Sequence, residues 1–179
     1  MYFVAIVCPE QINEKVLQFK NWMKTRFDCT VALKSPAHIT LVAPFWLENE
    51  KEAELIVSLM AFRSTTGHFD IRLEGFDHFG KRVLFIAVME NLLLKQLKEQ
   101  VDIHFLESFA GIMKKDTLTF HPHITIANRD MQPSHFEKGW EYFSKIDYSV
   151  SFTADSVSLL KLVEGKWKVI LEKDWSQKG

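Results

Sequence analysis

The chain has 179 residues, of which 47% are hydrophobic and 25% are charged, and its formal net charge is −1. This composition is typical of a globular protein with a sizeable core. The near-zero charge excludes a protein that wraps long nucleic acid, and two cysteines are too few for a disulfide scaffold. No segment approaches the ~20 apolar residues of a membrane span, so we expect a cytoplasmic protein that does not act at a membrane.

The first part of the chain alternates strands and helices. An apolar run over residues 2–8 predicts a buried strand, and Pro9 then opens a helix, where proline is tolerated. A second strand is predicted over residues 38–45, and Pro44 indicates that it ends there or lies at a sheet edge. Residues 50–63 follow as a second helix. The apolar residues of the first helix recur every three or four positions, as an amphipathic helix requires: Ile12, Val16, Phe19, Met23 and Phe27.

The middle of the chain begins with a half-exposed strand over residues 69–74, in which apolar and charged residues alternate. Residues 75–82 contain a turn around Gly80, and residues 83–89 form a nearly continuous apolar strand. Asn91 is a suitable N-cap for a helix from residue 92 to about residue 109. The remaining predictions are a helix end at Gly111, a loop through Lys114, Lys115 and Asp116, a strand over 123–128, a helix over 133–143, and strands over 148–153, 156–163 and 167–172, with a hairpin turn at 164–166.

This mixed order of strands and helices predicts an α+β fold with a trace of internal duplication. Each half has a strand, a helix, a strand containing His-x-Thr and another helix, and the two His-x-Thr strands follow their first strands at similar distances. No linker or low-complexity stretch separates the halves. We therefore expect one two-lobed domain over residues 1–179.

The most informative feature is a four-residue pattern that occurs twice. Both copies read histidine, apolar residue, threonine, apolar residue: His38-Ile39-Thr40-Leu41 and His123-Ile124-Thr125-Ile126. Successive side chains of a strand point to opposite faces, so each copy buries its aliphatic residues and presents its histidine and threonine together. Two such strands side by side would form a cleft with two imidazoles and two hydroxyls.

These groups suit the hydrolysis of a phosphodiester such as a 2',3'-cyclic phosphate, which needs a base for water and an acid for the departing ribose oxygen. Imidazole can do both because its unperturbed pKa of roughly 6.5 lies near working pH. We expect His38 and His123 to be the acid–base pair, with the hydroxyls of Thr40 and Thr125 donating to the non-bridging phosphate oxygens. This chemistry needs neither a metal nor a cofactor. The sequence does not indicate which histidine is the base.

At these residues the chain resembles the two-histidine phosphoesterase superfamily, whose hallmark is two copies of His-hydrophobic-Thr/Ser-hydrophobic. It is most similar to the branch of 2'-5' RNA ligase-like and cyclic phosphodiesterase proteins. The resemblance implies a bilobal α+β fold, with mixed or antiparallel sheets flanked by helices around a central cleft, and the same four catalytic roles. The second copy departs at one position: Asn128 stands where that branch often has arginine, and Arg129 follows it. Because one residue's shift reverses the facing on a strand, Arg129 can reach a phosphate only from a loop.

Further residues near the predicted cleft are candidates for substrate contact. Lys34 and Arg129 could bind a phosphate, Phe45 and Phe120 could stack on a base, and His121 could flank the cleft. The expected partner is a small nucleotide or an RNA terminus bearing a 2',3'-cyclic phosphate or a 2'-5' linkage, and we expect it to be bound by a monomer.

Three other functions stay open at this point. The cleft could hold a nucleotide or RNA end without turning it over, or the reaction could run as 2'-5' RNA ligation. His121 and His123 could also chelate a metal, since residues two apart share a strand face. Zinc normally has three or four protein ligands, however, and no third ligand is obviously placed.

Overall fold

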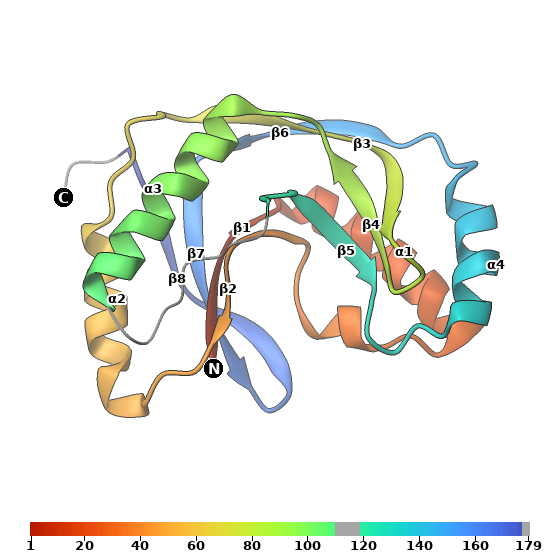
Figure 1. The fold of residues 1–179 in the computed structure, drawn as a ribbon, viewed down its shortest axis with the longest axis horizontal. Coiled ribbons are helices and arrows are strands. Elements are labelled where there is room, and N and C mark those ends of the chain that lie inside the picture. Colours follow the sequence, from red (N-terminus) through yellow and green to blue (C-terminus); the bar gives the residue numbers. More distant parts are fainter. Residues whose placement is uncertain (110–118, 177–179) are drawn as a thin grey trace.

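The computed structural model describes residues 1–109 and 119–176, and in it two antiparallel four-stranded sheets lie side by side with helices outside them (Figure 1). The strand order is β2-β1-β7-β8 in one sheet, called sheet A, and β5-β4-β3-β6 in the other, called sheet B. The predicted α+β class is confirmed. The elements in chain order are β1 Tyr2–Val7, α1 Glu10–Phe27, η1 Val31–Lys34, β2 His38–Phe45, η2 Asn49–Lys51, α2 Glu52–Ala61, β3 Phe69–Phe79, β4 Val83–Val88, α3 Leu92–Ser108, β5 His123–Ala127, α4 Pro133–Phe143, β6 Ser149–Ala154, β7 Ser156–Val163 and β8 Lys166–Asp174.

The series β1, α1, β2 in sheet A corresponds to β4, α3, β5 in sheet B. In both, the strand with the His-x-Thr pattern is an edge strand, and its one partner is the strand that precedes it in the series. The edge position explains why Pro44 is tolerated near the end of β2, since an edge strand leaves one side of its backbone unpaired. The trace of duplication in the sequence is thus a repeat of topology.

Each connecting helix packs on the sheet of the other half (Figure 1). Helix α1 joins two strands of sheet A but lies against β5, and its Phe19 ring meets Phe76 and Tyr148 at centroid distances of 5.2 Å and 5.4 Å. Helix α3 joins two strands of sheet B but lies against β2. Because each helix packs on the other half, apolar residues of both sheets are buried in one continuous core. This packing also brings the two edge strands β2 and β5 into contact.

Strand β3 is longer than predicted, because it does not end at residue 74 but continues through Gly75 to Phe79. Gly75 adopts φ +66°, and the register with β4 shifts between Leu73 and Phe76, which are the marks of a bulge. The predicted turn around Gly80 is confirmed, since the backbone N–H of Arg82 donates to the carbonyl of Phe79 at 3.2 Å.

Other boundaries differ by one to three residues, as cap geometry often makes them. The predicted helix over 50–63 is a short turn, η2, followed by α2. The predicted ends at Gly111 and at Lys114, Lys115 and Asp116 lie outside the described residues. Within residues 1–109 and 119–176, no helix has both the length and the apolar character needed to cross a bilayer.

Candidate active site

The two His-x-Thr patterns alternate in burial as their strand positions require. Ile39, Leu41, Ile124 and Ile126 are almost completely buried, with exposed fractions of 0%, 1%, 0% and 1%. The histidine and threonine of each copy are half-buried and face the other side of their strand. Each sheet therefore presents one imidazole and one hydroxyl at the edge where the sheets meet.

Two cavities meet at the Thr40 side chain, which lines both of them. The first, called the polar arm, has a volume of about 590 Å³ and includes His38 and Thr125. The second, called the aromatic arm, has a volume of about 570 Å³ and includes His123. The histidines and threonines of the two patterns thus line a pair of cavities that share Thr40. Their lining comes from both sheets, as the predicted cleft requires.

Both imidazoles are oriented by the same local hydrogen bond. The Nδ1–H of His38 donates to the carbonyl of Pro36 at 2.8 Å, and the Nδ1–H of His123 donates to the carbonyl of His121 at 2.8 Å. A carbonyl can only accept, so this bond places the proton of the neutral ring on Nδ1 and leaves Nε2 free. Each ring therefore offers Nε2 for proton transfer at the site.

The two histidines are not electrostatically equivalent. Burial lowers the pKa of His38 to about 4, and the positive charges of Lys20 and His123 act in the same direction, against the hydrogen bond to Pro36. Burial also lowers the pKa of His123, with a contribution from His121, but that shift is the milder of the two. The strands that carry the two rings, β2 and β5, are in contact.

Aromatic rings pack against both imidazoles. The Phe3 ring lies 4.9 Å from the ring of His38, and the rings of Phe79 and Phe85 each lie 5.0 Å from the ring of His123. This packing explains the desolvation of both imidazoles, because apolar rings replace water that would stabilise the charged form.

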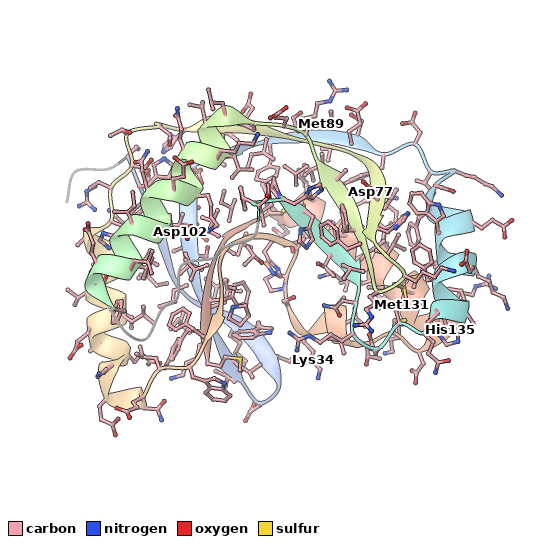
Figure 2. The ribbon with its side chains drawn as sticks, in the orientation of Figure 1. Lys34, Asp77, Met89, Asp102, Met131 and His135 are labelled. Carbon is pink, nitrogen blue, oxygen red and sulfur yellow. The ribbon has the colours of Figure 1, made fainter. Side chains whose placement is uncertain are left out.

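Two cations line the polar arm, one from each half of the chain. Lys34 ends η1, and Arg129 follows β5. Figure 2 shows Lys34 on the same side of the molecule as Met131 and His135, which also follow β5. Asp130 links the two segments, because its Oδ2 accepts from the backbone N–H groups of Thr30 and Val31 at 2.5 Å and 2.8 Å.

The structure places most of the predicted contact residues at the cleft. Lys34 and Arg129 line the polar arm, and Phe120 and His121 line the aromatic arm. Phe45 lines neither, since it packs on the Tyr2 ring at 6.2 Å. The one-residue shift after β5 does not turn Arg129 away, because the strand ends at Ala127 and its alternation stops there.

Several residues at the site were not found from the sequence. Asn128 and Trp167 line the polar arm, the latter from the β7–β8 hairpin. Lys20 is buried behind His38, with an exposed fraction of 3%. The sequence could have indicated that Lys20 is buried, because it follows Val16 by four positions and so falls on the apolar face of its helix. For Trp167 no local pattern distinguishes a cleft residue from any other strand residue.

The metal hypothesis requires a cluster of ligands, which is absent from the part of the chain that the structure describes. There, no group of three or more histidine, cysteine, aspartate or glutamate side chains is arranged to hold a metal ion. His121 and His123 are both packed against Phe79, at centroid distances of 5.1 Å and 5.0 Å. These two rings are thus held by an aromatic partner and have no third ligand beside them.

Comparison with known proteins identifies the family. The model of the 2'-5' RNA ligase superfamily matches residues 9–166. The chain belongs to this superfamily. It is 29% identical over 171 residues to a Geobacillus kaustophilus protein named "Putative phosphoesterase GK0864", and the match covers 94% of this chain and 92% of the relative. A similarly named Geobacillus sp. protein is 27% identical over 161 residues, covering 88% of each chain.

Solved structures share the fold of this chain. Escherichia coli LigT complexed with 3'-AMP superposes with a TM-score of 0.68 at 21% identity, covering 98% of both chains. LigT complexed with phosphate gives a TM-score of 0.60 at 20% identity, covering 98% of this chain and 97% of LigT. Membership of the superfamily and the matching relatives support an enzyme with phosphoesterase activity.

Proposed function

We propose that the protein is a metal-independent phosphodiesterase that hydrolyses a 2',3'-cyclic phosphate or a 2'-5' linkage in a small nucleotide or RNA end. The observation that carries the proposal is that His38, Thr40, His123 and Thr125 line two cavities that share Thr40, with one histidine in each arm. Solved complexes of LigT with 3'-AMP and with phosphate support a ligand of this chemical class. The monomeric state and cytoplasmic location stay predictions.

The cleft supplies a place for each part of such a substrate. The phosphate lies at Thr40, where both arms meet, and the hydroxyls of Thr40 and Thr125 donate to its non-bridging oxygens, on which charge accumulates in the transition state. Lys34 and Arg129 hold the phosphate from the polar arm, whose cations suit it. Water and the leaving ribose oxygen then lie on opposite sides of the phosphorus, each beside one imidazole Nε2.

The unequal surroundings of the histidines support different roles for them. His38 has the lower pKa, at about 4, so it is the ring that stays neutral and accepts a proton from water as general base. His123 keeps its proton to higher pH and gives it to the leaving oxygen as general acid. The rate should therefore follow a bell-shaped pH profile. The rise occurs as His38 loses its proton, and the fall occurs as His123 loses its own at higher pH.

The deciding experiment is a screen of nucleoside 2',3'-cyclic monophosphates and 2'-5' dinucleotides, with the regiochemistry of the product read out by NMR or chromatography. His38→Gln and His123→Gln should each lower turnover by at least about a hundredfold, the usual contribution of a general acid or base. His78→Gln is a matched control, because His78 also donates from Nδ1 to a backbone carbonyl, that of Gly80, at 2.9 Å but lines neither arm.

Three results would contradict the proposal. Near-normal activity in both single variants would remove the histidines from catalysis, and a flat profile from pH 5 to pH 8 would contradict paired imidazoles. Tight binding of a nucleotide that is recovered intact after long incubation would identify a binding module instead. Activity abolished by a chelator and restored by a divalent metal would reinstate the metal hypothesis.

A further inference from the structure

Each of the two corresponding helices, α1 and α3, buries one lysine, but the two lysines have different interaction partners. Lys20 of α1 is 3% exposed, and Lys98 of α3 is 8% exposed. Lys98 forms an ion pair with Asp102 on the next turn of α3. In the described part of the chain, no carboxylate lies within ion-pair distance of Lys20. Charged groups buried without a partner are rare because desolvation penalises them, so Lys20 calls for an explanation.

The Lys20 ammonium donates to the carbonyl of Ser35 at 2.9 Å, three residues before His38. The segment 35–37 that leads into His38 is held at every carbonyl. The Pro36 carbonyl accepts from His38 Nδ1 at 2.8 Å, and the Ala37 carbonyl accepts from the backbone N–H of Cys8 at 2.9 Å. Helix α1 therefore helps to fix the backbone that carries the imidazole into the cleft.

A second side chain of α1 completes this attachment. Asn13 accepts from the backbone N–H of Ala37 through Oδ1 at 2.5 Å, and it donates through Nδ2 to the Cys8 carbonyl at 2.5 Å. Asn13 and Lys20 are seven residues apart, which is about two turns, so they lie on the same face of α1. Two side chains from one face of α1 thus form hydrogen bonds to both ends of the segment 35–37.

Several charged or titratable groups lie around the segment that carries His38. Lys20 approaches from α1, and the Cys8 thiol lies at the end of β1, where burial raises its pKa to about 12 and keeps it neutral. His123 faces it from β5, and Lys34 and Arg129 line the polar arm. Burial lowers the pKa of Lys20 itself to about 8, so at pH 7 its ammonium is still charged. His38 is therefore surrounded by groups that are cationic or neutral.

We propose that Lys20 is a positioning residue for His38: its buried ammonium holds the segment that carries the imidazole and places an unneutralised positive charge behind it. The charge adds to burial in keeping His38 neutral, and the hydrogen bond to Ser35 helps to keep Nε2 aimed at the cleft. The catalytic consequence rests on the function proposed above. The effect on the protonation of His38 does not, and it can be measured in the absence of any substrate.

The test compares Lys20→Met, Lys20→Gln and the matched control Lys24→Met, which replaces an exposed lysine one turn along the same helix. The readout is the titration of the His38 ring followed by NMR. Removing the charge should raise the His38 titration midpoint by about one unit in both Lys20 variants, and Lys24→Met should leave it unchanged. Because the desolvation cost of the ammonium is removed, Lys20→Met should unfold at the same temperature as the wild type or higher.

Activity on a cyclic nucleotide separates the hydrogen bond from the charge. Lys20→Met should lower turnover about tenfold through a less ordered His38, whereas Lys20→Gln, whose amide can still donate to Ser35, should recover part of that loss. Both variants should move the acid limb of the pH–rate profile to higher pH. If no substrate is turned over by the wild type, the proposed function fails while the NMR titration still tests the role of Lys20.

An unchanged His38 midpoint in folded Lys20→Met or Lys20→Gln would overturn the proposal. An equal shift in Lys24→Met would do the same, because it would show only a general charge effect. Should both Lys20 variants fail to fold, the wild-type protein still decides, through the titration of the Lys20 ammonium by NMR. A Lys20 midpoint near 8 supports a charged group buried without a counterion, and an ordinary value near ~10.4 contradicts it.

Discussion

The two halves of this molecule present the same His-x-Thr pattern on corresponding edge strands, yet they place it in different electrostatic surroundings. The His38 ring lies against Phe3, with the unpaired ammonium of Lys20 behind its segment. The His123 ring lies against Phe79 and Phe85, while the buried lysine of its half, Lys98, is paired with Asp102. The comparison teaches that a duplicated motif can supply an acid and a base from one residue type.

The difference arises in what surrounds each imidazole and not in the hydrogen bond that orients it. Both histidines make the same Nδ1–carbonyl bond to the residue two positions earlier, at the same distance of 2.8 Å. The groups that distinguish them are Phe3 of β1 and Lys20 of α1 at His38, and Phe79 of β3 and Phe85 of β4 at His123. Because α1 and α3 each pack on the opposite half, each half contributes to the surroundings of the other's histidine strand.

The strongest test of this asymmetry uses the leaving group. A 2'-deoxynucleoside 3'-(4-nitrophenyl phosphate) has no 2'-hydroxyl, so water must attack, and 4-nitrophenoxide departs without needing a proton. His123→Gln, which removes the acid, should lose on the order of 10² in kcat/KM on a cyclic phosphate but less than about tenfold on the nitrophenyl ester. His38→Gln, which removes the base, should lose on the order of 10² on both.

The opposite pattern would exchange the two roles while leaving the pair catalytic. Equal losses on both substrates in both variants would show that the surroundings of His38 and His123 make no functional difference. The same assay on His78→Gln controls for effects of the substitution that do not pass through the cleft.

How far the sequence could predict this site is seen at β2 and β5. The sequence predicted the bounds of β2 as the structure has them, and the four catalytic candidates followed from the repeated motif, its facing on a strand and the chemistry of imidazole. The position of Lys20 could have been noticed on the apolar face of its helix, but not its partner, because the contact to Ser35 depends on how α1 packs. Which sheet a helix covers is a tertiary choice that local periodicity does not encode.

Gly75 shows the same limit on a smaller scale. A glycine that follows an alternating run favours the end of the strand, and the sequence analysis ended the strand at residue 74, just before Gly75. In the structure the residue is a bulge within β3, because pairing with β4 resumes at Phe76. Glycine permits either outcome through positive φ, and the long-range pairing of the strand decides between them.

The threonines offer a smaller test of the comparison between the halves. Thr40 lines both arms, whereas Thr125 lines only the polar arm. Thr→Val removes the hydroxyl at nearly constant volume, so it tests hydrogen bonding to the phosphate. Thr40→Val should lower kcat by about a hundredfold, the scale of one lost donor in the transition state, and Thr125→Val by about tenfold. The measurement is steady-state kinetics on the best cyclic nucleotide, with circular dichroism to confirm folding.

Equal effects of the two substitutions would show that the position of Thr40 between the arms has no special importance. A larger effect of Thr125→Val would place the phosphate in the polar arm, away from the junction. A rise in KM with unchanged kcat would mean that the hydroxyls bind substrate and transition state equally.

The smallest expected effect concerns stability at acid pH, and it compares His38 with His123 in the absence of substrate. The folded protein holds the pKa of His38 at about 4, below the ordinary histidine value of about 6.5. Between these values the unfolded chain binds a proton that the folded chain does not, so the free energy of unfolding falls as pH drops from 6.5 toward 4. His38→Gln should flatten this part of the curve of unfolding free energy against pH, measured by urea denaturation. His123→Gln should flatten it less, because burial lowers its pKa more mildly, and an equal effect of both would contradict the asymmetry.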